Sequence, residues 1–208
     1  MTDAPSVPRP LMAGVVLAAG AGRRFGQPKA PVVIDGERLV DRAVRNLMEG
    51  GCHKVVVVLG AWAGTVPEAT VVINDSWETG IASSLQAGLA GLASDPHVDR
   101  AIVTLVDLPG LTPAAVRRVA DSQSGLAVAT YQGRPGHPVL LARNHWPAIV
   151  AGSTGDRGAR DYLESRGDEV EHVEVSDVAS GRDLDSPRDV AGPDNWSDQC
   201  GFDIDFTS

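Results

Sequence analysis

The feature that most constrains the fold of this chain is a regular alternation of short β-branched runs with helix-like segments. The expected strands are residues 14–18, 54–59, 70–73, 101–106, 126–130, 138–141 and 171–175. The expected helices fall between them, at residues 38–49, 81–92, 113–121 and 156–166. Strands that alternate with helices in this way form a largely parallel sheet with helices packed on its faces. The sequence therefore predicts an α/β fold.

Two of the expected helices carry clear local signals. In residues 38–49, Leu39, Ala43 and Leu47 recur every four residues, which gives one apolar stripe that can pack on a sheet. Thr112 is a suitable N-cap for the helix at 113–121, and Pro113 occupies its first position. Both patterns favour helix over strand.

The length of 208 residues favours one domain, since domains hold roughly 100–200 residues. Hydrophobic residues make up 43% and charged residues 22% of the chain, which argues against a disordered or fibrous protein. We expect a flexible lead-in at residues 1–10, one folded domain at 11–190 and an acidic C-terminal tail at 191–208.

The charge of the chain excludes several partners. The formal net charge is −9, and residues 168–208 hold 12 of the 27 acidic residues but only two of the 18 Lys and Arg. Binding to nucleic acid or to an anionic membrane needs clustered Lys and Arg, so neither partner is expected. No run approaches the roughly 18 apolar residues of a membrane span, and no secretory leader is recognisable, which predicts a cytoplasmic protein. Cys52 and Cys200 match neither a disulfide framework nor a zinc motif.

The segment most informative about function is residues 15–29, VVLAAGAGRRFGQPK, in which a buried strand leads into a glycine-bearing loop with three cationic residues. Open α/β sheets bind ligands at the carboxyl ends of their strands. The loop is not a dinucleotide fingerprint, because Phe25 stands where the third glycine belongs, and it is not a P-loop, because Lys29 follows Pro28. Arg23, Arg24 and Lys29 instead favour an anion-binding loop suited to a triphosphate.

The same loop, from Leu17 to Lys29, resembles the signature loop of the MobA-like nucleotidyltransferases, especially the molybdenum cofactor cytidylyltransferases. Further stretches resemble the family in the same order: Asn74-Asp75 with Gly80, Ser83, Ser84 and Gly88; Asp107-Leu108-Pro109; residues 136–138; residues 155–160; and residues 183–189. Together they cover about residues 14–190. The resemblance implies a Rossmann-like, three-layer α/β/α fold with a mostly parallel mixed sheet.

The resemblance also implies a reaction. A nucleotide, CMP from CTP, would be transferred from a nucleoside triphosphate to a phosphate-bearing acceptor of the molybdopterin type, with release of pyrophosphate and with a molybdoenzyme as maturation partner. The second pKa of a phosphate monoester is about 6, so the acceptor is already largely ionised at neutral pH and no general base is required. Because two anions must approach each other, the expected cofactor is Mg²⁺.

Site roles follow from the resemblance. The implied catalytic residues are Lys29, Arg24 and Asp107, and the implied Mg²⁺ ligands are Asp107 and Asp185. The implied nucleotide-binding residues are Leu17, Ala18, Ala19, Gly20, Arg23, Lys29, Asn74, Gly80 and Ser83, with the main chain of 17–20 and Gly80 reading the base. His137 is the implied acceptor-binding residue. Plainer roles stay open: a turn cap for Asp107, a solvated acid for Asp185, a helix-start residue for Ser83 and a structural histidine for His137.

Three other functions stay open. Ala18-Ala19-Gly20 resembles the cytidylyl branch, whereas Ala21-Gly22 resembles the guanylyl branch, so GTP is an alternative to CTP. Relatives with a similar glycine–arginine loop include nicotine blue oxidoreductase, so an NADPH- or flavin-linked oxidoreductase is an alternative of another class. A catalytically silent nucleotide-binding module is the third.

Overall fold

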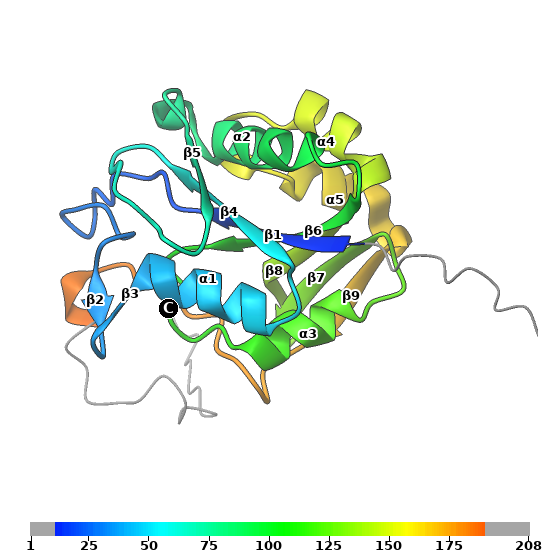
Figure 1. Cartoon of the computed structure of the whole chain (residues 1–208). Helices are drawn as coiled ribbons and strands as arrows, with labels where there is room; N and C mark the ends of the chain where they lie inside the picture. Colours follow the sequence, from blue (N-terminus) through cyan, green and yellow to red (C-terminus); the bar gives the residue numbers. More distant parts are fainter. Residues whose placement is uncertain (1–10, 190–208) are drawn as a thin grey trace, which may run out of the picture.

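The computed structural model describes residues 11–189, so the expected lead-in and the expected acidic tail lie outside the described residues. A seven-stranded sheet with the order β5-β4-β1-β6-β8-β7-β9 forms its centre (Figure 1). The strands are β1 Leu11–Leu17, β4 Lys54–Leu59, β5 Thr70–Ile73, β6 Val98–Leu105, β7 Leu126–Tyr131, β8 Arg134–Ala142 and β9 Val170–Glu174. A small hairpin, β2 Val33–Ile34 and β3 Glu37–Arg38, stands apart from it.

The sheet is parallel except at β8. β1 pairs in parallel with both β4 and β6, β4 with β5, and β7 with β9. β8 runs antiparallel to β6 on one side and to β7 on the other. The carboxyl ends of β1, β4 and β6 therefore meet at one edge of the sheet, where open α/β sheets bind ligands.

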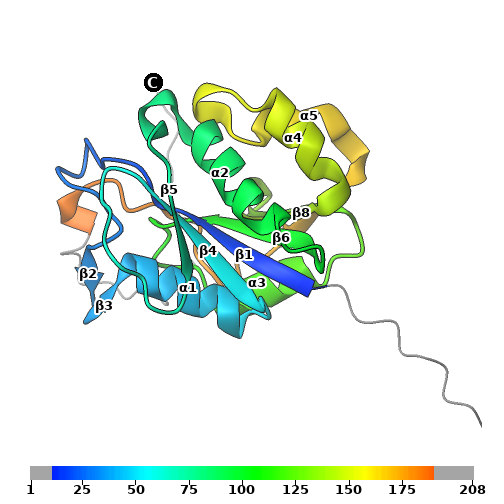
Figure 2. The same ribbon diagram turned by 45° about the horizontal axis from the view of Figure 1, so that its top comes forward.

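Helices cover both faces of the sheet. α1 Leu39–Glu49 and α3 Pro113–Ala120 lie on one face, and α2 Ile81–Ala93, α4 Trp146–Gly152 and α5 Arg160–Arg166 lie on the other (Figures 1 and 2). Each face has its own buried apolar cluster. Successive residues of β1 alternate between the two clusters, so the predicted three-layer α/β/α fold with a mostly parallel mixed sheet is confirmed.

The local signals act as expected. The Thr112 hydroxyl accepts a hydrogen bond from the backbone N–H of Ala115 at 3.3 Å, and Pro113 begins α3. Leu39, Ala43 and Leu47 are buried against the sheet. No helix among residues 11–189 is long and apolar enough to cross a membrane.

Two helices differ from the sequence prediction. The expected helix at 156–166 is divided, because a 3₁₀ turn at Gly155–Arg157 is followed by Gly158 with a φ of 54°, and α5 begins only at Arg160. α4 was not predicted, because Pro147 and Gly152 at its ends left too few residues for a visible period. Beyond these two helices, the hairpin of β2 and β3 was not predicted, and the strands of the central sheet and the other α-helices differ from their predicted bounds at most at their ends.

Candidate active site

Three chain segments bring opposite charges together beyond the carboxyl ends of β1 and β6. Lys29, from the loop after β1, places its Nζ 2.7 Å from Asp107 Oδ2 and 3.9 Å from Asp185 Oδ1. Arg24 of the same loop lies with its guanidinium 3.5 Å from Asp185 Oδ2. The structure therefore places four of the predicted site residues, far apart in sequence, in one cluster.

Buried side chains and one glycine fix the loop that carries Lys29. Phe25 and Ala30 are buried in the core and anchor the loop on either side of its tip. Gly22 has a φ of 60°, and a Cβ at this position would lie 1.9 Å from the carbonyl oxygen of Gln27. The tight turn from Gly22 to Gln27 thus requires glycine, and it sets where Arg23 and Arg24 leave the surface.

Leu184 attaches the segment that carries Asp185. Its backbone N–H donates to the carbonyl oxygen of Asp107 at 2.9 Å, and its side chain is fully buried. Asp183 and Asp185 flank this anchor and are exposed beside the cluster. The pKa of Asp183 is raised by partial burial of its carboxyl group and by the negative charges of Asp107 and Asp185.

Asp107 has one carboxylate oxygen free. Its Oδ2 accepts the Lys29 hydrogen bond, while its Oδ1 is buried without a hydrogen-bond partner. No group of three or more His, Cys, Asp or Glu side chains in residues 11–189 is arranged to hold a metal by itself. Mg²⁺ is usually bound by one or two carboxylates together with substrate phosphates and water, so the unpartnered oxygen of Asp107 beside Asp185 fits that ion.

A small cavity of about 180 Å³ opens next to this cluster. It is lined by Gly22, Arg23, Arg24, Phe25, Lys29 and Asp185. Arg23 is exposed and forms no hydrogen bond or ion pair with the described residues. Its charge is therefore available to an anion in the cavity.

The main chain of residues 17–20 is already partly engaged. The Leu17 carbonyl accepts from Val106 N–H, the Ala18 N–H donates to Val58, and the Ala19 carbonyl accepts from Ala61 N–H. Of the main-chain donors that we expected to read the base, the N–H groups of Ala19 and Gly20 lack partners among residues 11–189.

Asn74 and Ser83 hydrogen-bond to each other. The buried Asn74 amide donates to the hydroxyls of Ser83 and Ser84 at 2.9 and 3.0 Å, and its Oδ1 accepts from Ser76 N–H. Ser83 also donates to the Gly80 carbonyl at 2.9 Å. These contacts stabilise the turn before α2. For Ser83 this is the structural role of a helix-start residue, the alternative to binding the nucleotide.

Gly80 joins two walls of the site. Its φ is 113°, and a Cβ here would lie 2.4 Å from the backbone of Gly155, so the turn before α2 touches the turn before α5. Its N–H donates to the Trp77 carbonyl at 3.2 Å. Gly80 therefore enforces a close backbone approach, and its N–H is not free to read a base.

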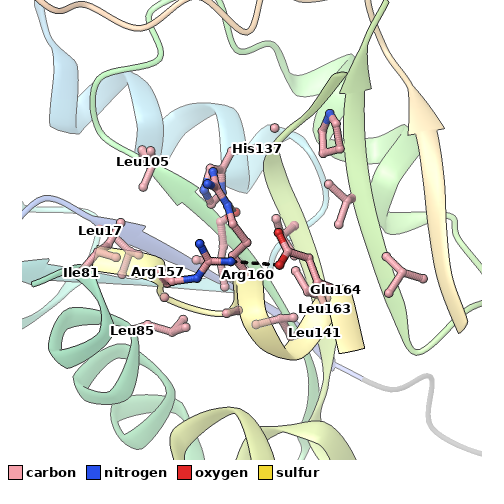
Figure 3. A pocket seen from close by; sticks show the side chains of 18 of the residues that line it. Leu17, Ile81, Leu85, Leu105, His137, Leu141, Arg157, Arg160, Leu163 and Glu164 are labelled. Atoms are coloured by element: carbon pink, nitrogen blue, oxygen red, sulfur yellow. Dashed lines mark hydrogen bonds and ion pairs between the residues drawn. The ribbon is translucent and has the colours of Figure 1, made fainter. Parts of the chain in front are cut away.

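A larger cavity of about 1180 Å³ lies between the sheet and helices α2 and α5 (Figure 3). His137 of β8 lines it, with Nδ1 3.2 Å from the Val103 carbonyl oxygen. Burial lowers the pKa of His137, which keeps the ring neutral at pH 7. Arg157 and Arg160 also line the cavity, and sequence reasoning gave neither a role, although both lie in the family-like stretch 155–160.

Comparison with known proteins shows the family to which the chain belongs. The MobA-like NTP transferase domain matches residues 14–172, which includes the carboxyl-terminal part of β1 and its loop, Asp107 and His137. The chain belongs to the MobA-like NTP transferase family. Asp183 and Asp185 lie beyond the matched region of this MobA-like domain.

Two curated relatives of this MobA-like protein carry different names. Nicotine blue oxidoreductase from Paenarthrobacter nicotinovorans is 36% identical over 193 residues, which is 85% of this chain and 93% of the relative. A molybdenum cofactor guanylyltransferase from Rhizobium johnstonii is 30% identical over 164 residues, 73% of this chain and 74% of the relative.

Solved structures share the MobA-like fold. Rv0371c from Mycobacterium tuberculosis H37Rv superposes with a TM-score of 0.74 at 27% identity, over 87% of this chain and 95% of that chain. A structure of Rv0371c in complex with manganese superposes with a TM-score of 0.65 at 24% identity, over 79% of this chain and 88% of that chain.

Proposed function

We propose that this chain transfers a nucleoside monophosphate from a nucleoside triphosphate to a phosphate-bearing acceptor and releases pyrophosphate. The observation that supports it is the cluster of Lys29, Asp107 and Asp185 at the carboxyl ends of β1 and β6, with one buried Asp107 oxygen unpartnered. Transfer of a nucleotide between two anionic reactants needs positive charge and a site for a metal cation more than it needs a general base. In this cluster Lys29 would supply the positive charge, and Asp107 and Asp185 would hold the cation.

Asp107 and Asp185 are the residues that would hold Mg²⁺. Bound there, the ion would supply positive charge that stabilises the departing pyrophosphate. The manganese complex of Rv0371c supports a divalent cation in this family. Carboxylate oxygens without His or Cys ligands suit hard cations such as Mg²⁺ and Mn²⁺.

The cationic residues of the loop would bind the triphosphate. Lys29 is mostly buried and held by Asp107, which gives it a defined position for the β- and γ-phosphates. Arg23 and Arg24 are exposed at the small cavity and can add charge as the leaving group forms. No side chain is required to remove a proton, because the acceptor phosphate is already ionised at neutral pH.

The base and the acceptor are proposed from similarity. Ala19 in Ala18-Ala19-Gly20 supports CTP, and the guanylyltransferase among the relatives supports GTP as the alternative. The same relative supports a molybdopterin-type acceptor.

A second candidate, an oxidoreductase, is favoured by one observation. Nicotine blue oxidoreductase matches this chain over 93% of its own length. A hydride transfer with NADPH or a flavin has no need of the carboxylate pair or the unpartnered oxygen of Asp107, so we rank it second.

A thermal-shift series with CTP, GTP, ATP, NADPH and FMN, each with and without Mg²⁺, tests the proposal. A ligand at about 100 times its Kd adds roughly 2.7 kcal/mol to stability, which for a chain of this size raises the Tm by roughly 5–10 °C. We expect such a shift for a triphosphate only with Mg²⁺. A shift with NADPH or FMN and none with triphosphates would favour the oxidoreductase.

Asp107→Asn sharpens this test. Since the amide keeps the size of the side chain but binds Mg²⁺ poorly, the variant should lose the Mg²⁺-dependent part of the shift, measured from its own ligand-free Tm. Asp121→Asn, an exposed residue at the end of α3, is the matched control. An unchanged Mg²⁺-dependent shift in Asp107→Asn would contradict the metal assignment.

A further inference from the structure

The larger cavity has an apolar floor. Leu17 of β1, Val103 and Leu105 of β6, and Val139 of β8 form its base, and Ile81 and Leu163 close it from α2 and α5 (Figure 3). Ligand pockets of roughly 300–1000 Å³ bury most of a drug-sized molecule, so a cavity of about 1180 Å³ holds one with room to spare. The apolar floor can bind a flat ring system, because contact with apolar side chains removes the apolar surface of the ring from water.

Two arginines on the same wall differ in their partners. Arg157 is held by Asp161, with which it forms a short hydrogen-bonded ion pair, and by Glu164 at 2.9 Å. Arg160 forms no hydrogen bond or ion pair with any residue in 11–189. One guanidinium is therefore neutralised by the protein, and the other is not.

Arg160 faces the same part of the cavity as His137. Its positive charge contributes to the lowered pKa of the His137 ring, so the two groups lie close together, as they do in Figure 3. The charge of Asp107 acts on the same ring in the opposite direction. Arg160 and Asp107 therefore both lie within electrostatic range of the His137 ring.

The cavity lining also holds four carboxylates. They belong to Asp156, Glu164, Asp168 and Asp183, and none lies within 4.0 Å of the Arg160 guanidinium. Arg160 is therefore the one arginine of the lining whose charge no carboxylate pairs with, so an anionic group would be attracted to it. The neutral ring of His137 adds hydrogen-bonding capacity there without a competing charge.

We propose that Arg160 binds the phosphate monoester of a ligand whose apolar, ring-bearing body rests on the floor of this cavity. The inference depends on the proposed function, because that ligand is the acceptor and its phosphate would be presented at the Asp107 end. Arg160 then selects acceptors that carry a phosphate over those that carry only the ring. Arg157, already paired, does not share this role.

Binding of 1-naphthyl phosphate, 1-naphthol and inorganic phosphate to the full chain, measured by titration calorimetry, tests the proposal. The wild type should bind 1-naphthyl phosphate at least fivefold more tightly than either of the other two. Arg160→Gln should lose this preference while its weak binding of 1-naphthol persists, and Arg160→Lys should retain part of it. Arg157→Gln is the matched control on the same wall and should change the affinity less than twofold.

Arg23→Gln distinguishes the two cavities. If 1-naphthyl phosphate binds at the triphosphate loop, Arg23→Gln will weaken it and Arg160→Gln will not, and the proposal is then wrong. It is equally wrong if the wild type shows no preference for the phosphate-bearing probe. The Mg²⁺-dependent thermal shift with nucleoside triphosphates is measured on the same variants, so failure of the proposed function is seen separately.

Discussion

Lys29 and Asp107 neutralise each other across 2.7 Å when no ligand is bound. A metal ion that arrives alone would have to compete with Lys29 for Asp107, and a triphosphate that arrives alone would have to compete with Asp107 for Lys29. When the two arrive together, the phosphates take Lys29 and the metal takes Asp107. We therefore expect the site to favour the metal–triphosphate complex over either part.

Lys29→Met tests this coupling. Without the competing ammonium group, free Mn²⁺ should bind to the ligand-free protein roughly tenfold more tightly, equivalent to ~1.4 kcal/mol. The stabilisation by a Mg²⁺–triphosphate complex should fall in the same variant, because the phosphates lose a cation. Electron paramagnetic resonance of unbound Mn²⁺ measures the first effect and a thermal shift measures the second.

Lys54→Met provides the control, since Lys54 is the only other lysine and pairs with Asp95 away from the cluster. It should change neither measurement. Equal or weaker Mn²⁺ binding by Lys29→Met would show that Lys29 does not compete for Asp107.

Individual residues of the cluster were predictable, but their contacts were not. Lys29, Asp107 and Asp185 follow from their place in motif-like stretches, whereas the contact between Lys29 and Asp107 joins residues 78 apart in sequence. Asn74 shows the opposite case, because the stretch predicted ligand binding and the folded turn uses its amide internally. Such hydrogen bonds depend on the loop conformation, which a linear pattern does not contain.

At the scale of elements, one carboxylate holds the turn between β7 and β8. Gln132 and Gly133 form a two-residue turn with positive φ angles of 51° and 77°, a conformation that costs energy at Gln132. Glu174, at the end of β9, accepts hydrogen bonds from both of their N–H groups at 3.1 Å and from the Thr130 hydroxyl at 2.9 Å. Glu174 also accepts a short hydrogen bond from Ser176.

Hydrogen bonds from Ser176, Gly133 and Gln132 lower the pKa of Glu174 from 4.5 to about 2, the Ser176 hydroxyl having the largest effect. A carboxyl group whose pKa is lower in the folded than in the unfolded protein stabilises the fold when the pH is above its pKa in the unfolded protein. This stabilisation is lost as the pH falls to its pKa in the folded protein. The wild type should therefore lose this contribution between about pH 4.5 and pH 2. Glu174→Gln should have a lower Tm at pH 7 and a flatter decline over that range, as followed by circular dichroism.

Glu68→Gln serves as the reference, because Glu68 is exposed and has no hydrogen bond or ion pair within residues 11–189. Parallel acid curves for the wild type and Glu174→Gln would contradict the role of Glu174.

All seven strands of the central sheet were predicted, whereas only α1, α2 and α3 among the α-helices were predicted whole. The β-branched runs at Lys54–Leu59 and Thr70–Ile73 gave the observed bounds, because β-branched residues fit a pleated sheet. The divided helix near Arg160 depends on the backbone of Gly158, and a single glycine does not mark a helix break in sequence. The conformation of the segment that carries Arg160 was therefore the part of the site that the sequence predicted least well.

At the scale of the whole molecule, the reversal of β8 shapes the site. The parallel strands β1 and β6 deliver Lys29 and Asp107 to one edge, and the antiparallel β8 brings His137 to the same edge from the opposite direction. The triphosphate loop and the larger cavity thus meet near Asp107. The resemblance predicted this fold class, but the sequence pattern alone did not show which strand was reversed.

Nucleotide preference can be measured on the whole fold. If the cytidylyl-like Ala18-Ala19-Gly20 sets the base, Mg²⁺ with CTP should raise the Tm by several degrees more than Mg²⁺ with GTP or ATP at equal concentration. A larger shift with GTP would assign the chain to the guanylyl type, as its Rhizobium relative is named. Asp107→Asn controls for effects of nucleotide that do not involve the metal.

The contact between Gly80 and Gly155 has a consequence for how such a site can diversify. Because backbone meets backbone there, the spacing between the turns that precede α2 and α5 is set without any side chain. Substitutions on α5 and β8 can then alter which molecule binds in the larger cavity while the spacing of the two turns stays the same. A new specificity in this architecture would require a handful of point changes and no rebuilding of loops, provided that both glycines are retained.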